Sequence, residues 1–306
     1  MPKRFIVFVV LLTVTIVGVL LYFVFRKQPQ NIIQSQKPEK ISSKSVSFPK
    51  LSENQNIILY YNSPEAVFYQ ININNKQEEA LSNMLSFVES VSWSNEGTKV
   101  YLKARNIQAA KTESFFYSAG RPYEEITTWL YDLETKNKSA LDKNFGIIAW
   151  SQDSKKIVYQ YNDGKTNNLN IADPDGKNWK KITDIKENIV YLAALSESEI
   201  VYSATETTES FNVIKTDGSG KRIVKLPLSV STNKIAWQEE GKSIIVAMRE
   251  TGKSTDTFYK IDVQSGNKTE IKYSFSGAID AKNLMLTKDG KTLYFTSDDF
   301  LYKMEM

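Results

Sequence analysis

The sequence contains no cysteine and no histidine among its 306 residues. The absence of cysteine excludes disulfides, thiolate metal sites and cysteine nucleophiles. The absence of histidine removes the usual base of a Ser-His-Asp triad, the commonest zinc ligand and the one side chain that titrates unperturbed near neutral pH. The enzyme classes that depend on these two residues are therefore excluded, whereas 41% hydrophobic residues are enough for a sizeable core.

Net charge is also missing from most of the chain. The formal excess of +4 is accounted for by four basic residues that flank the first apolar run, with no acidic residue among residues 1–27: Lys3, Arg4, Arg26 and Lys27. The remainder is formally neutral and has no net field to attract a polyanion. We therefore expect no nucleic-acid partner.

One long apolar run, FIVFVVLLTVTIVGVLLYFVF at 5–25, carries no charge. At a rise of about 1.5 Å per residue, its 21 residues match the hydrocarbon core of a bilayer. A cleaved signal peptide and a buried core helix are the alternatives, but the run is longer than a typical signal h-region and no small-x-small site follows it. We predict an uncleaved signal-anchor transmembrane helix within 1–27. Its N-terminus would be cytoplasmic and the rest of the chain extracytoplasmic, at a bacterial surface or in a periplasm.

The chain after this run reads as a linker followed by a β-rich domain. Residues 28–44 are polar, contain two prolines and show no sustained periodicity, which predicts a linker. From residue 45 to residue 306, short runs of Val, Ile, Tyr and Phe are interrupted by Asn, Asp, Gly and Ser. That pattern is typical of many short antiparallel strands.

An eight-residue hairpin motif recurs along this domain. The clearest copies are WSNEGTKV at 93–100, WSQDSKKI at 150–157, WQEEGKSI at 237–244 and LTKDGKTL at 286–293. Weaker copies are LSENQNII at 51–58 and AALSESEI at 193–200. The anchors are 42 to 49 residues apart, except for 57 residues in the second unit. Such periodicity indicates a repeat architecture of six units.

Each complete unit also contains a second apolar run that ends in an Asp or Asn turn. Examples are TWLYDLETKN at 128–137 and FYKIDVQSGNK at 258–268. With a short final strand, this makes four strands per unit, the pattern of a β-propeller blade. The repeats resemble the TolB-type, WD-like propeller family, whose hallmark is a W-S-x-D-G hairpin. The resemblance covers about 45–306 and implies an all-β, six-bladed propeller of four-stranded antiparallel blades, acting through binding.

Several repeated residues have an expected structural role. The tryptophan should pack between blades, and the Ser, Asp and Gly that follow should form a tight turn. The anchors we assign to this role are Trp93, Trp150, Trp237, Asp153, Gly241, Asp289 and Gly290. The last unit stops after three strands, so we predict that a segment within 31–48 completes it and closes the ring.

Sequence motifs that resemble phosphate-binding and calcium-binding loops are better explained as turns. Gly-Lys-Ser/Thr occurs at Gly164, Gly241, Gly252 and Gly290, but the earlier glycine of a phosphate-binding loop is missing in each case. The sequence at 173–176 lacks the later ligands of a calcium loop. We predict no catalytic residue, no cofactor and no metal.

The unusually long second unit holds the candidate binding site. Its extra length comes from a loop at 107–126 in which aromatic residues and an arginine gather: Phe115, Phe116, Tyr117, Arg121 and Tyr123. This composition is typical of binding hot spots on a loop that a rigid ring positions. The alternative is that these aromatic residues cap the ring itself. The loops at 203–210 and 249–256 should open on the same face.

Three functions are compatible with these observations. The leading hypothesis is a non-catalytic, membrane-tethered and monomeric propeller that binds another protein or an envelope component. The second is a hydrolase-type propeller with a carboxylate or metal-oxygen site in its channel. The third is a small-ligand sensor with a deep central pocket. Fold alone does not choose between them, because propellers host unrelated functions.

Overall fold

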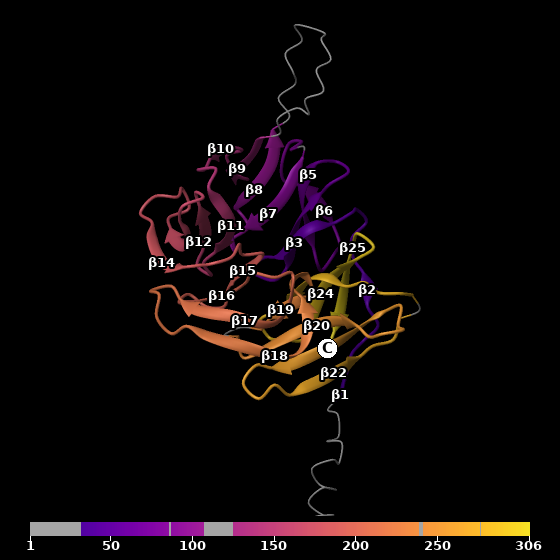
Figure 1. Ribbon diagram of the computed structural model, residues 1–306. Coiled ribbons are helices and arrows are strands. Elements are labelled where there is room, and N and C mark those ends of the chain that lie inside the picture. Colours follow the sequence, from indigo (N-terminus) through magenta and orange to yellow (C-terminus); the bar gives the residue numbers. More distant parts are fainter. Residues whose placement is uncertain (1–31, 86, 107–124, 239–240, 276) are drawn as a thin grey trace, which may run out of the picture.

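The chain forms a ring of six β-sheets in a computed structural model (Figure 1). The structure describes residues 32–306 apart from 86, 107–124, 239–240 and 276. Each sheet is one blade, and within a blade consecutive strands pair antiparallel from the channel outward. The predicted six-bladed, four-stranded architecture is confirmed.

The first three blades follow the chain in order. Blade one contains β3 (Ser47–Leu51), β4 (Ile57–Asn62), β5 (Val67–Asn72) and β6 (Glu78–Ala80). Blade two contains β7 (Val88–Trp93), β8 (Lys99–Asn106), β9 (Glu125–Asp132) and β10 (Lys138–Ala140). Blade three contains β11 (Phe145–Trp150), β12 (Ile157–Asn162), β13 (Asn167–Ala172) and β14 (Lys180–Asp184).

The last three blades include a 3-10 turn and both N-terminal strands. Blade four contains β15 (Tyr191–Ala194), β16 (Glu199–Ser203), β17 (Thr207–Lys215) and β18 (Arg222–Ser231), and the 3-10 turn η1 (Thr232–Lys234) follows. Blade five contains β19 (Ile235–Trp237), β20 (Ser243–Arg249), β21 (Asp256–Asp262), β22 (Lys268–Lys272) and the added strand β1 (Ile32–Gln34). Blade six contains β23 (Lys282–Leu286), β24 (Thr292–Ser297), β25 (Phe300–Glu305) and β2 (Glu39–Lys40).

The middle strands are apolar on both faces because each blade is packed between two others. In β20, the five residues 243–247 are all buried. The core lies between neighbouring blades: Phe211 of blade four is fully buried with Ile244 and Ile261 of blade five in one cluster. A strand buried on both faces needs no polar alternation, which explains the continuous Ile-Val-Tyr runs that follow each hairpin.

The N-terminal segment closes the ring, as predicted. Strand β2 pairs antiparallel with β25 as the outermost strand of blade six. Beyond it, Ile41 donates its backbone N–H to the carbonyl of Leu301, and Val46 donates to that of Asp299. The side chains of Ile41 and Val46 are buried. Strand β1 adds a parallel fifth strand to β22, which the sequence did not predict. Part of the segment with linker composition is thus built into the ring.

The fourth hairpin is one residue shorter than the others. In the other five blades, the residues paired across the hairpin are seven apart, as in Trp150 with Ile157. In blade four, Ala194 pairs with Ile200, only six residues later. The anchor of this unit is therefore Ala194, and the sequence assignment to Ala193 is off by one position. The shorter turn explains why this copy of the motif aligns poorly.

The predicted transmembrane helix at 5–25 lies outside the described residues. Within the part of the chain that the structure describes, no helix has the length and apolar character to cross a membrane.

Candidate functional site

The two faces of the ring differ in the segments that form them. The hairpins between first and second strands lie on one face, which we call the hairpin face: residues 52–56, 94–98, 151–156, 195–198, 238 with 241–242, and 287–291. The opposite face, which we call the connection face, carries the turns between second and third strands and the links from blade to blade.

The six innermost strands surround a central cavity of about 930 Å³. This volume is within the range of small-molecule pockets, about 300–1,000 Å³. Three consecutive positions of each innermost strand line it in all six blades, namely the hairpin anchor and the two residues before it, and the middle one directly precedes the anchor. The occupants of this middle position are Lys50, Ser92, Ala149, Ala193, Ala236 and Met285. Four of the six side chains are small, which leaves the channel open.

Lys50 is the charged member of this set. Its side chain is half-buried and makes neither an ion pair nor a hydrogen bond with any residue that the structure describes. Burial lowers the pKa of its ammonium group. A desolvated cation without a counter-charge is costly, and such groups are enriched at functional sites.

Three acidic residues reach the cavity from its hairpin end: Glu53, Asp153 and Glu197. They come from blades one, three and four, so the hairpins of Glu53 and Glu197 stand on opposite sides of a six-bladed ring. Among the described residues, no group of three or more Asp and Glu side chains is placed to hold a metal ion. Glu53 and Glu197 are therefore separate charges on opposite sides of the cavity.

Asp153 holds its own hairpin together. Its carboxylate accepts hydrogen bonds from the Ser151 hydroxyl (2.7 Å) and the Lys155 backbone N–H (3.1 Å), which hold the pKa of Asp153 below its ordinary value. Asp289 accepts the equivalent bonds in blade six, at 2.7 and 3.0 Å. In blade one the side-chain oxygen of Asn54 does the same. The repeated Asp is a turn residue in this geometry.

The repeated tryptophans lie between blades. Trp93 donates its indole N–H to the carbonyl of Phe48 over 2.7 Å, in the innermost strand of blade one. Trp150 donates to the carbonyl of Ser92 over 3.0 Å, in blade two. Trp237 differs, because its indole nitrogen is buried and makes no hydrogen bond. Its ring instead packs edge-on against Phe211.

Gly241 and Gly290 occupy hairpin turns with φ of +67° and +69°. A Cβ at Gly241 would approach Leu195 to 3.1 Å, and one at Gly290 would approach Gln238 to 3.0 Å. Both glycines therefore combine a left-handed backbone with close contact to the hairpin of the preceding blade. Gly164 and Gly252 also have positive φ, but they lie in open turns of the connection face.

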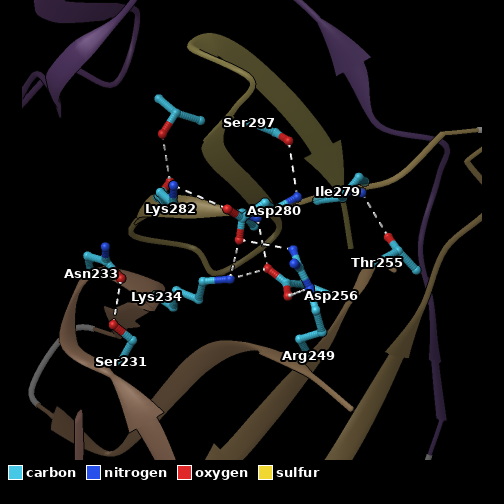
Figure 2. Close-up of polar contacts among 12 residues, drawn as sticks. Ser231, Asn233, Lys234, Arg249, Thr255, Asp256, Ile279, Asp280, Lys282 and Ser297 are labelled. Atoms are coloured by element: carbon cyan, nitrogen blue, oxygen red, sulfur yellow. Dashed lines mark hydrogen bonds and ion pairs between the residues drawn. The ribbon is translucent and has the colours of Figure 1, made fainter. Parts of the chain in front are cut away.

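An ionic cluster around the buried carboxylate of Asp256 joins the last three blades at the connection face (Figure 2). The ammonium of Lys234 lies 2.6 Å from a carboxylate oxygen of both Asp256 and Asp280. Asp256 is fully buried and also accepts the backbone N–H of Ala281, at 2.9 Å. Arg249 contacts both carboxylates, from 3.4 and 3.1 Å.

The same cluster has an unbalanced charge. Lys282 contacts the second oxygen of Asp280 over 3.1 Å, so three cations face two carboxylates. One oxygen of Asp256 is buried and makes no hydrogen bond. Asn233, which lines the central cavity, directly precedes Lys234. The connection-face mouth of the channel is therefore next to a net positive cluster.

Exposed apolar side chains are unevenly divided between the two faces. Six large apolar side chains are exposed among the described residues, and four of them lie on the connection face: Met84, Phe87, Ile126 and Val190. The other two, Trp179 and Ile223, lie toward the hairpin face of the outer strands. Met84 and Phe87 precede β7, and Ile126 is near the start of β9.

The predicted binding loop begins at the same edge. Strand β8 ends at Asn106 and β9 begins at Glu125, and both of these strand ends lie at the connection face. Phe115, Phe116, Tyr117, Arg121 and Tyr123 lie outside the described residues. The turns at 204–206 and 250–255 join the equivalent strands of blades four and five, so they belong to this face too.

Sequence reasoning missed Lys50 and the Lys234–Asp256–Asp280 cluster. A signal for Lys50 was present, because it precedes a hairpin anchor at a position where the clear repeats have Ser, Ala, Ala and Met. The ionic cluster had no such signal, since its members come from three separate segments that the ring brings together.

No family model and no curated protein matches this sequence. Solved structures do share its fold. TolB from Acinetobacter baumannii is 13% identical with a TM-score of 0.50 over 86% of this chain, which spans only 55% of that chain. An oligogalacturonate lyase from Vibrio parahaemolyticus is 11% identical with a TM-score of 0.52, over 84% of this chain and 76% of the other. The Cps50 (Swd1) propeller of Myceliophteria thermophila is 10% identical with a TM-score of 0.55, over 88% and 98%. At these identities the likeness concerns the fold alone.

Proposed function

We propose that this protein is a non-catalytic binding module that recognises a partner protein through the connection face of its propeller. The observation that carries the proposal is that four of the six large exposed apolar side chains of the described residues lie on that face: Met84, Phe87 and Ile126 at the edge of blade two, and Val190 at the start of blade four. Exposed apolar side chains that cluster on one face mark interaction sites, whereas scattered ones do not. The strand ends that flank the aromatic-rich 107–124 segment in the sequence, Asn106 and Glu125, lie at the same face.

The proposal includes a membrane tether. The uncharged run at 5–25 anchors the chain in a bilayer, with the propeller outside the cytoplasm. The ring begins at residue 32, so only a short segment separates it from the anchor. The bound partner is then another protein or an envelope component near the same membrane.

The arrangement of acidic residues favours binding over hydrolysis. Asp153 is engaged in its own turn, and Glu53 and Glu197 belong to blades on opposite sides of the ring. General acid–base pairs of the glycosidase type need carboxylates about 5–10 Å apart. The adjacent Asp298 and Asp299 form the two-residue turn between β24 and β25, with positive φ at both positions. Their role is therefore to form this hairpin turn.

Face-specific substitution tests this function. The full chain, solubilised in a neutral detergent, is used to capture partners from membranes of its own organism. We expect one specific partner to be lost from the double variant Phe87→Ser and Ile126→Ser, and from a variant lacking 107–124. The matched control is Trp179→Ser with Ile223→Ser, which removes apolar side chains that are at least as exposed but lie away from that face. Equal loss from both double variants would contradict the proposal.

A further inference from the structure

The channel position that precedes each hairpin anchor provides an internal comparison across the ring. It is small or apolar in five blades and is Lys50 in blade one. All six side chains occupy the same place in the same strand of the same fold. Closing the ring therefore does not require a cation at this position, as Met285 in the adjacent blade demonstrates.

No described residue balances the positive charge of the Lys50 ammonium group. Its side chain is half-buried in the cavity wall, with no ion pair or hydrogen bond among the described residues. Removing an ammonium from water without a partner is unfavourable, and an anion bound beside it would recover that cost. The cavity is large enough for a small organic molecule.

The other charged residues that line the cavity determine which kind of anion Lys50 could bind. Lys288 is the other basic residue that lines the cavity in the described chain, and it stands at the hairpin end with Glu53, Asp153 and Glu197. A dianion such as a phosphate ester would meet more negative than positive charge there, and none of the described residues that line the cavity is an arginine, which could offer a bidentate fork. A single carboxylate matches Lys50, the one half-buried cation among the described residues that line the cavity, since Lys288 is exposed.

Neutral polar groups are available for the rest of such a ligand. Asn233 uses its side-chain oxygen to accept a bond from Ser231, and its amide donors have no partner among the described residues. Gln55 likewise accepts a bond from the backbone of Lys288 through its oxygen. Both line the cavity. Unused amide donors favour a ligand body that carries hydroxyl or carbonyl oxygens.

We propose that Lys50 anchors the carboxylate of a small, oxygen-rich monocarboxylic acid in the central channel of the propeller. The acid enters at the connection face, where the Lys234 cluster carries one net positive charge. Of the four exposed apolar residues proposed to bind the partner, Val190 also lines the cavity, whereas Met84, Phe87 and Ile126 do not. The variants that test the two proposals therefore change different residues, and either proposal can fail alone.

The test uses the full chain in neutral detergent, with its lysines reductively methylated with a ¹³C label, which preserves their charge. The Lys50 resonance is assigned by its loss in Lys50→Met, a substitution that copies blade six. The probes are lactate, gluconate and benzoate, each compared with its uncharged amide, and inorganic phosphate. We expect at least one acid to shift this resonance saturably, with the corresponding amide binding about tenfold more weakly or worse.

Calorimetry on the unlabelled chain supplies the controls. Lys50→Met and Lys50→Ala should weaken binding of that acid by about tenfold or more, whereas Lys288→Met should leave it within about twofold. Binding by none of the acids, equal affinity in Lys50→Met, or tighter binding of phosphate than of every acid would each overturn the proposal.

Discussion

The indole N–H of Trp150 donates a hydrogen bond to the backbone carbonyl of Ser92, 3.0 Å away in the preceding blade. This bond and the packing of the ring make Trp150 a link between blades two and three. Trp150→Phe keeps an aromatic ring but removes the donor, which should lower the free energy of unfolding by about 1 kcal/mol. Urea unfolding of purified protein measures this value.

The chain contains a matched control for that prediction. The indole nitrogen of Trp237 is buried without a hydrogen bond. Trp237→Phe removes an unsatisfied donor, so its cost should be well below that of Trp150→Phe. An equal loss in the two variants would show that the interblade hydrogen bond contributes nothing and that ring size alone matters.

Asp153 is predicted to act through its turn and not through charge. Asp153→Ala removes the acceptor of the Ser151 and Lys155 bonds and should destabilise the protein by about 1 kcal/mol. Asp153→Asn should be nearly neutral, because Asn54 makes the equivalent bonds in blade one. Thermal unfolding of both variants distinguishes a role in the turn from a role of the negative charge. A large loss of stability in Asp153→Asn would contradict the role in the turn.

Closure of the ring depends on residues 39–46. A chain that begins at residue 47 lacks β2 and the buried side chains of Ile41 and Val46. Each buried aliphatic side chain contributes about 1.5–3 kcal/mol, so this truncation should cost at least about 3 kcal/mol and expose the edge of β25. A chain that begins at residue 32 should unfold cooperatively and remain monomeric by light scattering. Equal stability of the two chains would show that β2 does not close the ring.

Acid should weaken the ionic cluster through Asp280. Burial alone would raise the pKa of Asp280, but hydrogen bonds from Lys234 and Lys282 outweigh it and hold the pKa below its ordinary value of 3.8. A folded-state pKa below the unfolded one contributes stability above the unfolded value, and that contribution disappears as pH falls through the folded value. Unfolding free energy should therefore decline below about pH 4. The decline should be shallower in Asp280→Asn, and an unchanged acid slope in that variant would exclude this contribution.

The repeat made the architecture predictable from sequence. The Trp-Ser-x-Asp hairpin recurs because each blade must place the same aromatic ring against its neighbour and close the same tight turn. The missing last strand of blade six predicted closure by the N-terminal segment. The parallel pairing of β1 with β22 was not predictable, because three residues of an edge strand carry no periodic signal.

The residues of the candidate site were harder to predict from the sequence than the fold. Lys50 differs from its counterparts at one position of the repeat, so a position-by-position comparison of the six units could have identified it. Lys234, Asp256 and Asp280 are far apart in the sequence, and their meeting depends on how blade five joins blade six. Partner recognition at 107–126 stays a prediction.

The central claim is that partner recognition uses the connection face, and site-specific photo-crosslinking in living cells tests it most directly. A photoreactive phenylalanine analogue replaces Phe87 in one full-length chain and Trp179 in another, since both positions are exposed and aromatic but belong to different faces. The account predicts a discrete crosslinked protein from position 87 that disappears on Ile126→Ser, and none from position 179. A crosslink from position 179 alone, or the same product from both positions, would contradict it.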